Sequence, residues 1–89
     1  MENTVERTVV VGSKSGLHAR PAAIFVQNAK SFQSQITLGK NERTANGKSI
    51  LSVLALGAEK GDQVVLTISG GDAETALTKL VRLLEGDLG

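Results

Sequence analysis

The sequence predicts an α+β domain spanning residues 1–89, an open-faced sandwich in which three helices cover one face of a four-stranded, mainly antiparallel sheet. Three observations favour this class: strand-like and helix-like patterns alternate in the order β-α-β-β-α-β-α, glycines mark short connections, and 89 residues suffice for one small domain. Short connections place consecutive elements side by side, and helices cover the apolar sheet face. Periodicity alone leaves a ferredoxin-like arrangement open, because that fold also uses split β-α-β units.

The first strand and the first helix are joined by a short loop. Val5 to Val11 is rich in β-branched residues with apolar positions at period two, which predicts a strand that ends at Gly12. Residues 13–16 then form the loop. Ala19 to Ser31 has apolar residues at helical spacing, and Pro21 is compatible with this helix because it lies in the first turn.

The middle of the chain predicts a hairpin, and a later segment predicts a central strand. Gln35 to Leu38 and Glu42 to Ala45 are short strands joined by a turn at residues 39–41. The second of them is too polar for the centre of a sheet, so we expect it at an edge. Val64 to Ser69 alternates apolar and polar residues, which is typical of a well-paired strand with one buried face.

Two further helices are bounded by residues that favour helix ends. Ser49 is a good N-cap for a short helix from Ile50 to Leu56, which Gly57 ends because glycine readily adopts a left-handed conformation. Asp72 is the expected N-cap of the last helix, which carries one apolar stripe and ends at Gly86. The helix over 50–56 has more apolar side chains than two layers can bury, which favours a partner surface.

Composition excludes several classes of function. Ten basic and nine acidic side chains give a net charge of +1, too balanced for a general nucleic-acid or anionic-membrane binder, and two phenylalanines offer no platform for stacking bases. The chain has no cysteine, which fits the cytoplasm, and we expect no metal and no cofactor. No segment approaches the ~20 apolar residues of a membrane span, and no apolar run follows the first residues, so we expect a soluble, unexported protein.

The segment Gly16 to Ala22, with the sequence GLHARPA, is the strongest functional signal. The unpaired N–H groups and the dipole at a helix N-terminus stabilise a phosphate. His18 supplies an imidazole that can act as a nucleophile, and Arg20 supplies a guanidinium for phosphate oxygens. The same residues fit a plain surface or capping histidine, or a domain that binds an anion without reacting with it.

This segment, together with Asn46 to Gly57 (NGKSILSVLALG), resembles the signatures of the HPr family, the histidine-containing phosphocarrier proteins of the bacterial phosphotransferase sugar-uptake system. The resemblance covers essentially the whole chain. It implies that Nδ1 of His18 accepts a phosphoryl group from phosphorylated enzyme I and passes it to the IIA domains of sugar permeases. It also implies that the Arg20 side chain and the backbone of Gly16, Leu17, Ala19 and Arg20 support the phosphate.

In the same resemblance, Ser49 matches a regulatory phosphorylation site. A bifunctional HPr kinase/phosphorylase modifies this serine in many Gram-positive bacteria, which lowers acceptance from enzyme I and favours a catabolite-control transcription regulator. A phosphate at this helix N-terminus would be stabilised, and the expected docking surface around it is formed by Lys48, Ile50, Leu51 and Leu54. A role limited to capping the helix is the alternative.

Other members of this group remain as alternatives. Retention of His18 argues against paralogous regulators that keep the serine but replace the active histidine. No residue excludes a nitrogen-branch carrier, which uses the same histidine for regulation, and the segment from Gly39 to Arg43 departs from the family pattern. One histidine without a carboxylate pair or a metal cluster disfavours a self-contained enzyme, so we expect a monomeric protein co-substrate of phosphotransferases.

Overall fold

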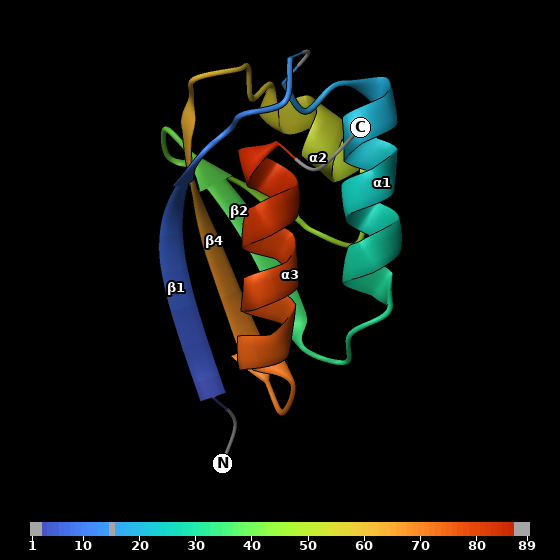
Figure 1. Cartoon of the computed structure of the whole chain (residues 1–89), viewed down its shortest axis with the longest axis vertical. Helices are drawn as coiled ribbons and strands as arrows, with labels where there is room; N and C mark the ends of the chain where they lie inside the picture. Colours follow the sequence, from blue (N-terminus) through green and yellow to red (C-terminus); the bar gives the residue numbers. More distant parts are fainter. Residues whose placement is uncertain (1–2, 15, 87–89) are drawn as a thin grey trace.

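The computed structural model describes residues 3–14 and 16–86, so Ser15, in the predicted loop, lies outside the described part. The elements follow the predicted order (Figure 1). They are β1 (Asn3–Val10), α1 (Ala19–Lys30), β2 (Gln35–Lys40), β3 (Arg43–Asn46), α2 (Ile50–Leu56), β4 (Gln63–Gly70) and α3 (Ala73–Glu85).

The four strands form one sheet in the order β1-β4-β2-β3, and every neighbouring pair is antiparallel. β4 therefore lies inside the sheet between β1 and β2, and β3 lies at an edge, as the sequence predicts. Ile68 of β4 faces Val5 of β1 and Ile36 of β2. This register places the apolar positions of three strands in one row on the covered face.

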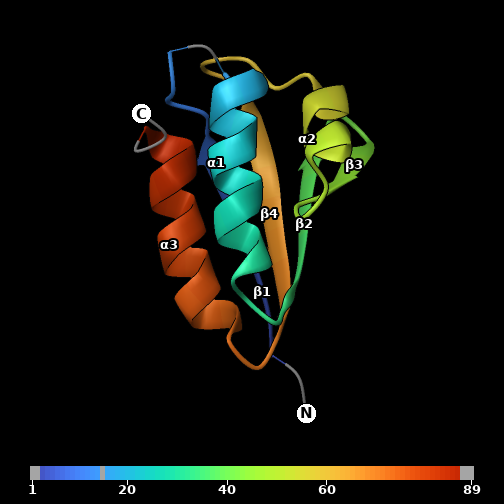
Figure 2. The same ribbon diagram turned by 90° about the vertical axis from the view of Figure 1, so that its right-hand side faces the viewer.

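The helices cover one face of the sheet and leave the other face open (Figures 1 and 2). Val64, Leu66 and Ile68 of β4 are fully buried, whereas the alternate residues Val65 and Thr67 are only partly buried. Burial of the apolar faces of α1 and α3 against this row supplies the main stabilising contribution, the hydrophobic effect. The predicted α+β open-faced sandwich is confirmed.

The β2–β3 turn differs from the prediction. Lys40 pairs with Arg43, so the two turn residues are Asn41 and Glu42, with φ angles of 50° and 66°. A two-residue hairpin turn with both φ angles positive matches the right-handed twist of its strands, and asparagine tolerates that conformation. Gly39, expected in the turn, lies within β2.

Asp72 occupies the N-cap position of α3, but its side chain does not cap the helix. Its carboxylate accepts the N–H groups of Gln33 and Ser34 at 2.9 and 3.0 Å, together with the Ser34 hydroxyl. The hydrogen bonds from the Ser34 hydroxyl and the Gln33 N–H lower the pKa of Asp72 from its ordinary value. Asp72 thus connects the β4–α3 turn to the loop before β2.

The ends of α2 are as predicted. The Ser49 hydroxyl accepts the N–H of Ser52 at 3.4 Å, and Gly57 adopts a left-handed conformation with φ 69°. These two ends limit α2 to seven residues. Within the described residues, no helix has the length and apolar character needed to cross a membrane.

Candidate functional site

His18 is the N-cap residue of α1, in an extended conformation with φ −90° and ψ −164°. Its carbonyl accepts the N–H of Ala22 at 2.8 Å, which begins the helix. Its ring makes no capping hydrogen bond, and 55% of the side chain is exposed. Leu17, directly before it, is fully buried. The backbone of the site is therefore held by the core while the imidazole faces outward.

The turn before His18 lies against the loop that follows α2. Gly16 has a φ of 67°, and a Cβ at this position would lie 2.6 Å from the carbonyl oxygen of Ala58 and 2.7 Å from the Cα of Glu59. Both the conformation and the close approach require glycine. The Leu17 N–H donates to the Ala58 carbonyl at 2.8 Å, and the Ser13 hydroxyl donates to the Gly16 carbonyl at 2.8 Å.

The four backbone N–H groups that the family resemblance implies for a phosphate fall into two pairs, one with acceptors in the protein and one without. The N–H groups of Gly16 and Leu17 already donate to the carbonyls of Ser13 and Ala58, at 3.0 and 2.8 Å, so in this conformation they shape the turn and do not face an anion. The N–H groups of Ala19 and Arg20 have no acceptor among the described residues, as expected for the first turn of a helix. These two remain as donors for a phosphate.

Arg20 lies in the exposed first turn of α1. Within residues 3–14 and 16–86, its guanidinium makes no hydrogen bond or ion pair. An unpaired guanidinium can turn its planar set of donors toward phosphate oxygens without first breaking another contact. Pro21 follows within the same turn, where its missing N–H costs no helical hydrogen bond.

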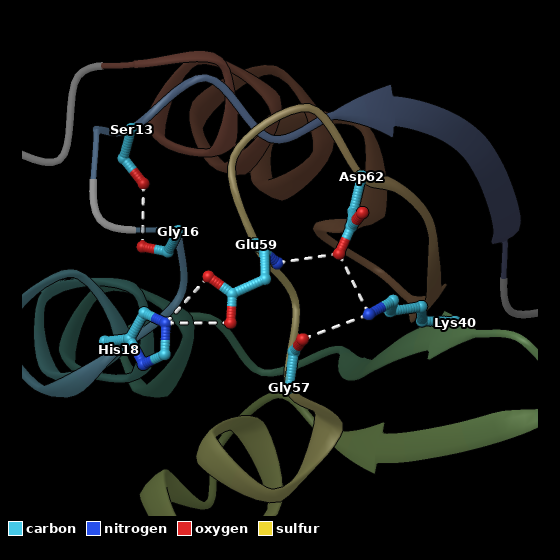
Figure 3. A network of polar contacts seen from close by, with 7 residues as sticks. All are labelled: Ser13, Gly16, His18, Lys40, Gly57, Glu59 and Asp62. Carbon is cyan, nitrogen blue, oxygen red and sulfur yellow. Dashed lines mark hydrogen bonds and ion pairs between the residues drawn. The ribbon is translucent and has the colours of Figure 1, made fainter.

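Glu59 is a neighbour of His18 that no pattern in the sequence predicts. The Nε2 atom of His18 lies 3.0 Å from Oε1 and 3.1 Å from Oε2 of Glu59 (Figure 3). The two residues are 41 positions apart in the chain and meet because the histidine turn lies on the α2–β4 loop. A single glutamate beside a lysine in a glycine-bounded loop carries no motif, so no local signal indicates this contact.

The loop that carries Glu59 is fixed by a second polar cluster (Figure 3). The Glu59 N–H donates to Oδ2 of Asp62 at 2.8 Å, and the same oxygen lies 2.9 Å from Nζ of Lys40. Lys40 also donates to the Gly57 carbonyl at 3.0 Å. The hydrogen bonds from Lys40 and from the Glu59 N–H lower the pKa of Asp62 from its ordinary value.

The expected docking residues lie around α2, whose exposed side is apolar. Ile50, Leu51 and Leu54 are 38%, 77% and 37% exposed, while Val53 and Leu56 fill the core. Lys48 is partly buried, and its ammonium donates to the Phe32 carbonyl at 2.7 Å, so it is already engaged.

This site offers a nucleophile and an anion-binding surface, with the Glu59 carboxylate beside the nucleophile. Among the described residues, no group of three or more His, Cys, Asp or Glu side chains could hold a metal ion. The exposed imidazole of His18, the open amides of Ala19 and Arg20 and the Arg20 guanidinium can together receive a group that carries negative charge.

A family model described as "PTS HPr component phosphorylation site" matches residues 5–86 of this chain. The chain belongs to the HPr family. It is therefore an HPr-family phosphocarrier protein of bacterial type, as the resemblance of the two sequence segments implies.

Individual HPr-family proteins are similar to this chain in sequence and in structure. The phosphocarrier protein HPr of Vibrio cholerae is 39% identical over 80 residues, which cover 90% of this chain and 94% of the relative. The crystal structure of HPr from Bacillus anthracis matches with a TM-score of 0.89 and 41% identity, over 91% of this chain and 96% of that chain. A crystal structure of Crh from Bacillus subtilis, described as an intertwined dimer with a swapped domain, matches with a TM-score of 0.74 and 40% identity. The match covers 92% of this chain and 97% of that chain.

Proposed function

We propose that Nδ1 of His18 accepts a phosphoryl group from phosphorylated enzyme I and that the chain passes it to the IIA domains of sugar permeases. The observation that supports this proposal most is the position of His18, a 55% exposed imidazole at the N-terminus of α1. The donors around it, the N–H groups of Ala19 and Arg20 and the Arg20 guanidinium, are suited to a dianionic group. Family membership supplies the chemical class.

The bond between phosphorus and an imidazole nitrogen explains why such a site suits a relay. The phosphoryl group leaves imidazole readily, so transfer in either direction can run close to equilibrium when donor and acceptor sites are alike. Arg20 stabilises the loose, anionic group during transfer more than it stabilises the resting histidine. The chain then acts as a co-substrate of phosphotransferases, in the cytoplasm and as a monomer.

The direct experiment is intact-mass and phosphorus NMR analysis after incubation with phosphoenolpyruvate, magnesium and a catalytic amount of enzyme I. We expect one acid-labile, base-stable phosphoryl group in the wild-type protein and none in His18→Ala. A domain that binds an anion without reacting with it would hold phosphate reversibly and gain no mass. Enzyme I must be shown to be active on a known carrier, and the host's own enzyme I excludes a mismatch of partners.

A regulatory role of Ser49 is a second candidate function, favoured by the likeness to Crh of Bacillus subtilis, which is described as a catabolite repression protein. Ser49 caps α2 beside the exposed Ile50 and Leu51, so a phosphate there would add charge within the expected docking surface. The partners in this role would be HPr kinase/phosphorylase and a catabolite-control transcription regulator. Incubation with the kinase and ATP tests it, with Ser49→Ala as the control.

The choice between a sugar-uptake carrier and a nitrogen-branch carrier depends on the acceptor. We propose the sugar branch, since the two segments around His18 and Ser49 together resemble its members. Transfer from the phosphorylated chain to sugar-specific IIA domains, measured beside a nitrogen-branch IIA domain, distinguishes the two. Preferential transfer to the nitrogen-branch domain would replace the first proposal.

A further inference from the structure

The contact between His18 and Glu59 indicates which ring nitrogen carries hydrogen. Both carboxylate oxygens of Glu59 lie within 3.1 Å of Nε2, and an ionised carboxylate can only accept hydrogen bonds. Nε2 must then carry hydrogen. In a neutral imidazole the other nitrogen, Nδ1, therefore holds the free electron pair.

We propose that Glu59 is a positioning residue for phosphoryl transfer, which keeps His18 in the tautomer whose Nδ1 is the nucleophile. This proposal rests on the proposed function, because it concerns the same histidine and the same transfer. A carboxylate that orients an imidazole and selects one tautomer is an established device in other active sites. In this chain the orienting carboxylate comes from the α2–β4 loop and not from α1.

In the transfer step, the hydrogen is already on Nε2 before Nδ1 reacts. The electron pair on Nδ1 of His18 forms the bond to phosphorus, and the pair of the breaking bond leaves with the donor group of enzyme I. The hydrogen on Nε2 stays where it is, so the phosphorylated ring becomes a cation that faces the Glu59 carboxylate. Transfer to the acceptor reverses these events, and no proton has to enter or leave the ring.

The position of Glu59 is set by backbone contacts as well as by the histidine. Its N–H donates to Asp62, and the N–H of Asp62 donates back to the Glu59 carbonyl at 3.0 Å. Lys40 pairs with Asp62, and the side chains of this pair are only 20% and 33% exposed. The loop is thus fixed from the inner side, while the Glu59 side chain itself is 60% exposed. Fixing the backbone lowers the entropy lost when the carboxylate meets the ring.

The tautomer can be measured without any partner protein. Nitrogen-15 NMR of the His18 ring, at a pH well above the ordinary imidazole pKa of about 6.5, reports the hydrogen on each nitrogen separately. We expect a hydrogen almost wholly on Nε2 in the wild-type protein. In Glu59→Ala we expect the mixture found in a free peptide of residues 16–22. Glu59→Gln keeps an acceptor and removes the charge, so we expect an intermediate population.

The same variants are compared for the rate of acceptance from phosphorylated enzyme I. Both side chains are more than half exposed, and exposed pairs contribute modestly, so we expect Glu59→Ala to slow acceptance by about fivefold, with Glu59→Gln in between. Glu74→Gln, which removes an equal charge near the start of α3 at the opposite end of the molecule from the start of α1, is the matched control and should leave both readouts unchanged (Figure 1).

The outcomes separate this role from the proposed function. Equal tautomer populations in wild type and Glu59→Ala, or faster acceptance by Glu59→Ala, would overturn the role of Glu59 even if His18 is phosphorylated. Failure of the wild-type protein to gain a phosphoryl group would overturn the proposed function, and the tautomer measurement would still show whether Glu59 orients the ring. Circular dichroism of each variant confirms that the fold is intact.

Discussion

The N–H of Leu17 donates to the carbonyl oxygen of Ala58 at 2.8 Å, and this bond joins the turn before His18 to the loop after α2. It is formed by two buried residues, so it is protected from water. The histidine turn and the Glu59 loop consequently form one unit, although they come from distant parts of the sequence. Variants on one side of this contact are expected to alter the other.

Gly16 is the residue on which that unit depends. Gly16→Ala is expected to lower the free energy of unfolding by more than about 1 kcal/mol. The alanine would have to adopt the left-handed φ of 67°, and its Cβ would lie 2.6 Å from the Ala58 carbonyl oxygen. Chemical denaturation measures this loss. Gly71→Ala is the matched control, since its Cβ would meet nothing within 4 Å, and stability should change little. Equal stability of the two variants would contradict the assigned contact.

Arg20 is expected to act on transfer and not on folding. Arg20→Ala should slow acceptance from enzyme I on the order of 100-fold, the usual effect of removing one preorganised donor, while stability stays within about 0.5 kcal/mol. Arg20→Lys keeps the charge without the planar set of donors and should recover only part of the rate. Rapid-quench kinetics with denaturation controls measure both quantities, and an unchanged rate in Arg20→Ala would remove this side chain from the mechanism.

The hydrogen bonds of the Asp72 carboxylate make the stability of the fold depend on pH. The Ser34 hydroxyl and the Gln33 N–H lower the pKa of Asp72 in the folded protein, so the carboxylate favours the folded state. This contribution is complete above the unfolded pKa of about 3.9 and is lost as the pH falls through the lower folded pKa. Asp72→Asn should therefore be less stable than wild type at pH 7, and the difference should shrink below about pH 4.

Urea denaturation at a series of pH values measures that difference. Glu74→Gln removes an equal charge two residues away and leaves the hydrogen bonds to Gln33 and Ser34 in place, so it controls for net charge. A stability difference between Asp72→Asn and wild type that stayed constant from pH 7 to pH 2 would argue against this assignment.

Two substitutions of Ser49 distinguish its capping role from a regulatory role. Ser49→Ala should lower stability by about 1 kcal/mol or less, because the capping hydrogen bond is 3.4 Å long. Ser49→Asp keeps a capping oxygen and adds charge beside the exposed apolar surface of α2, so we expect near-normal stability and slower acceptance from enzyme I. Acceptance kinetics identical to wild type in Ser49→Asp would leave capping as the supported role.

Local chemistry in the sequence predicts much of this fold. The alternation in β4 indicates a strand with one buried face, and the polar character of β3 indicates an edge. Ser49 and Gly57 mark the ends of α2 because an N-cap and a left-handed C-cap depend on neighbouring backbone alone. The hairpin turn was predicted wrongly because Gly39 is a strong turn signal, whereas the turn is made by Asn41 and Glu42.

Contacts between distant segments explain what the sequence did not reveal. Asp72 follows the local pattern of an N-cap, yet its carboxylate meets Ser34, 38 positions away. Glu59 meets His18 across 41 positions, and the Leu17 N–H, one of the donors that the family resemblance implies for a phosphate, donates to the Ala58 carbonyl instead. Each of these depends on how two loops meet, which neither periodicity nor a short motif specifies.

The open placement of His18 has a kinetic consequence for the proposed relay. More than half of the His18 side chain is exposed. In the proposed mechanism one ring nitrogen both receives and gives up the phosphoryl group, so donor and acceptor must bind the surface around it one after the other. In this proposed relay, each partner must therefore dissociate before the other can reach the nitrogen. Tight binding to either partner would then lower the flux, because residence time lengthens as affinity rises. If α2 is the docking surface, as proposed, its three exposed apolar side chains, Ile50, Leu51 and Leu54, would suit a small interface and short-lived complexes.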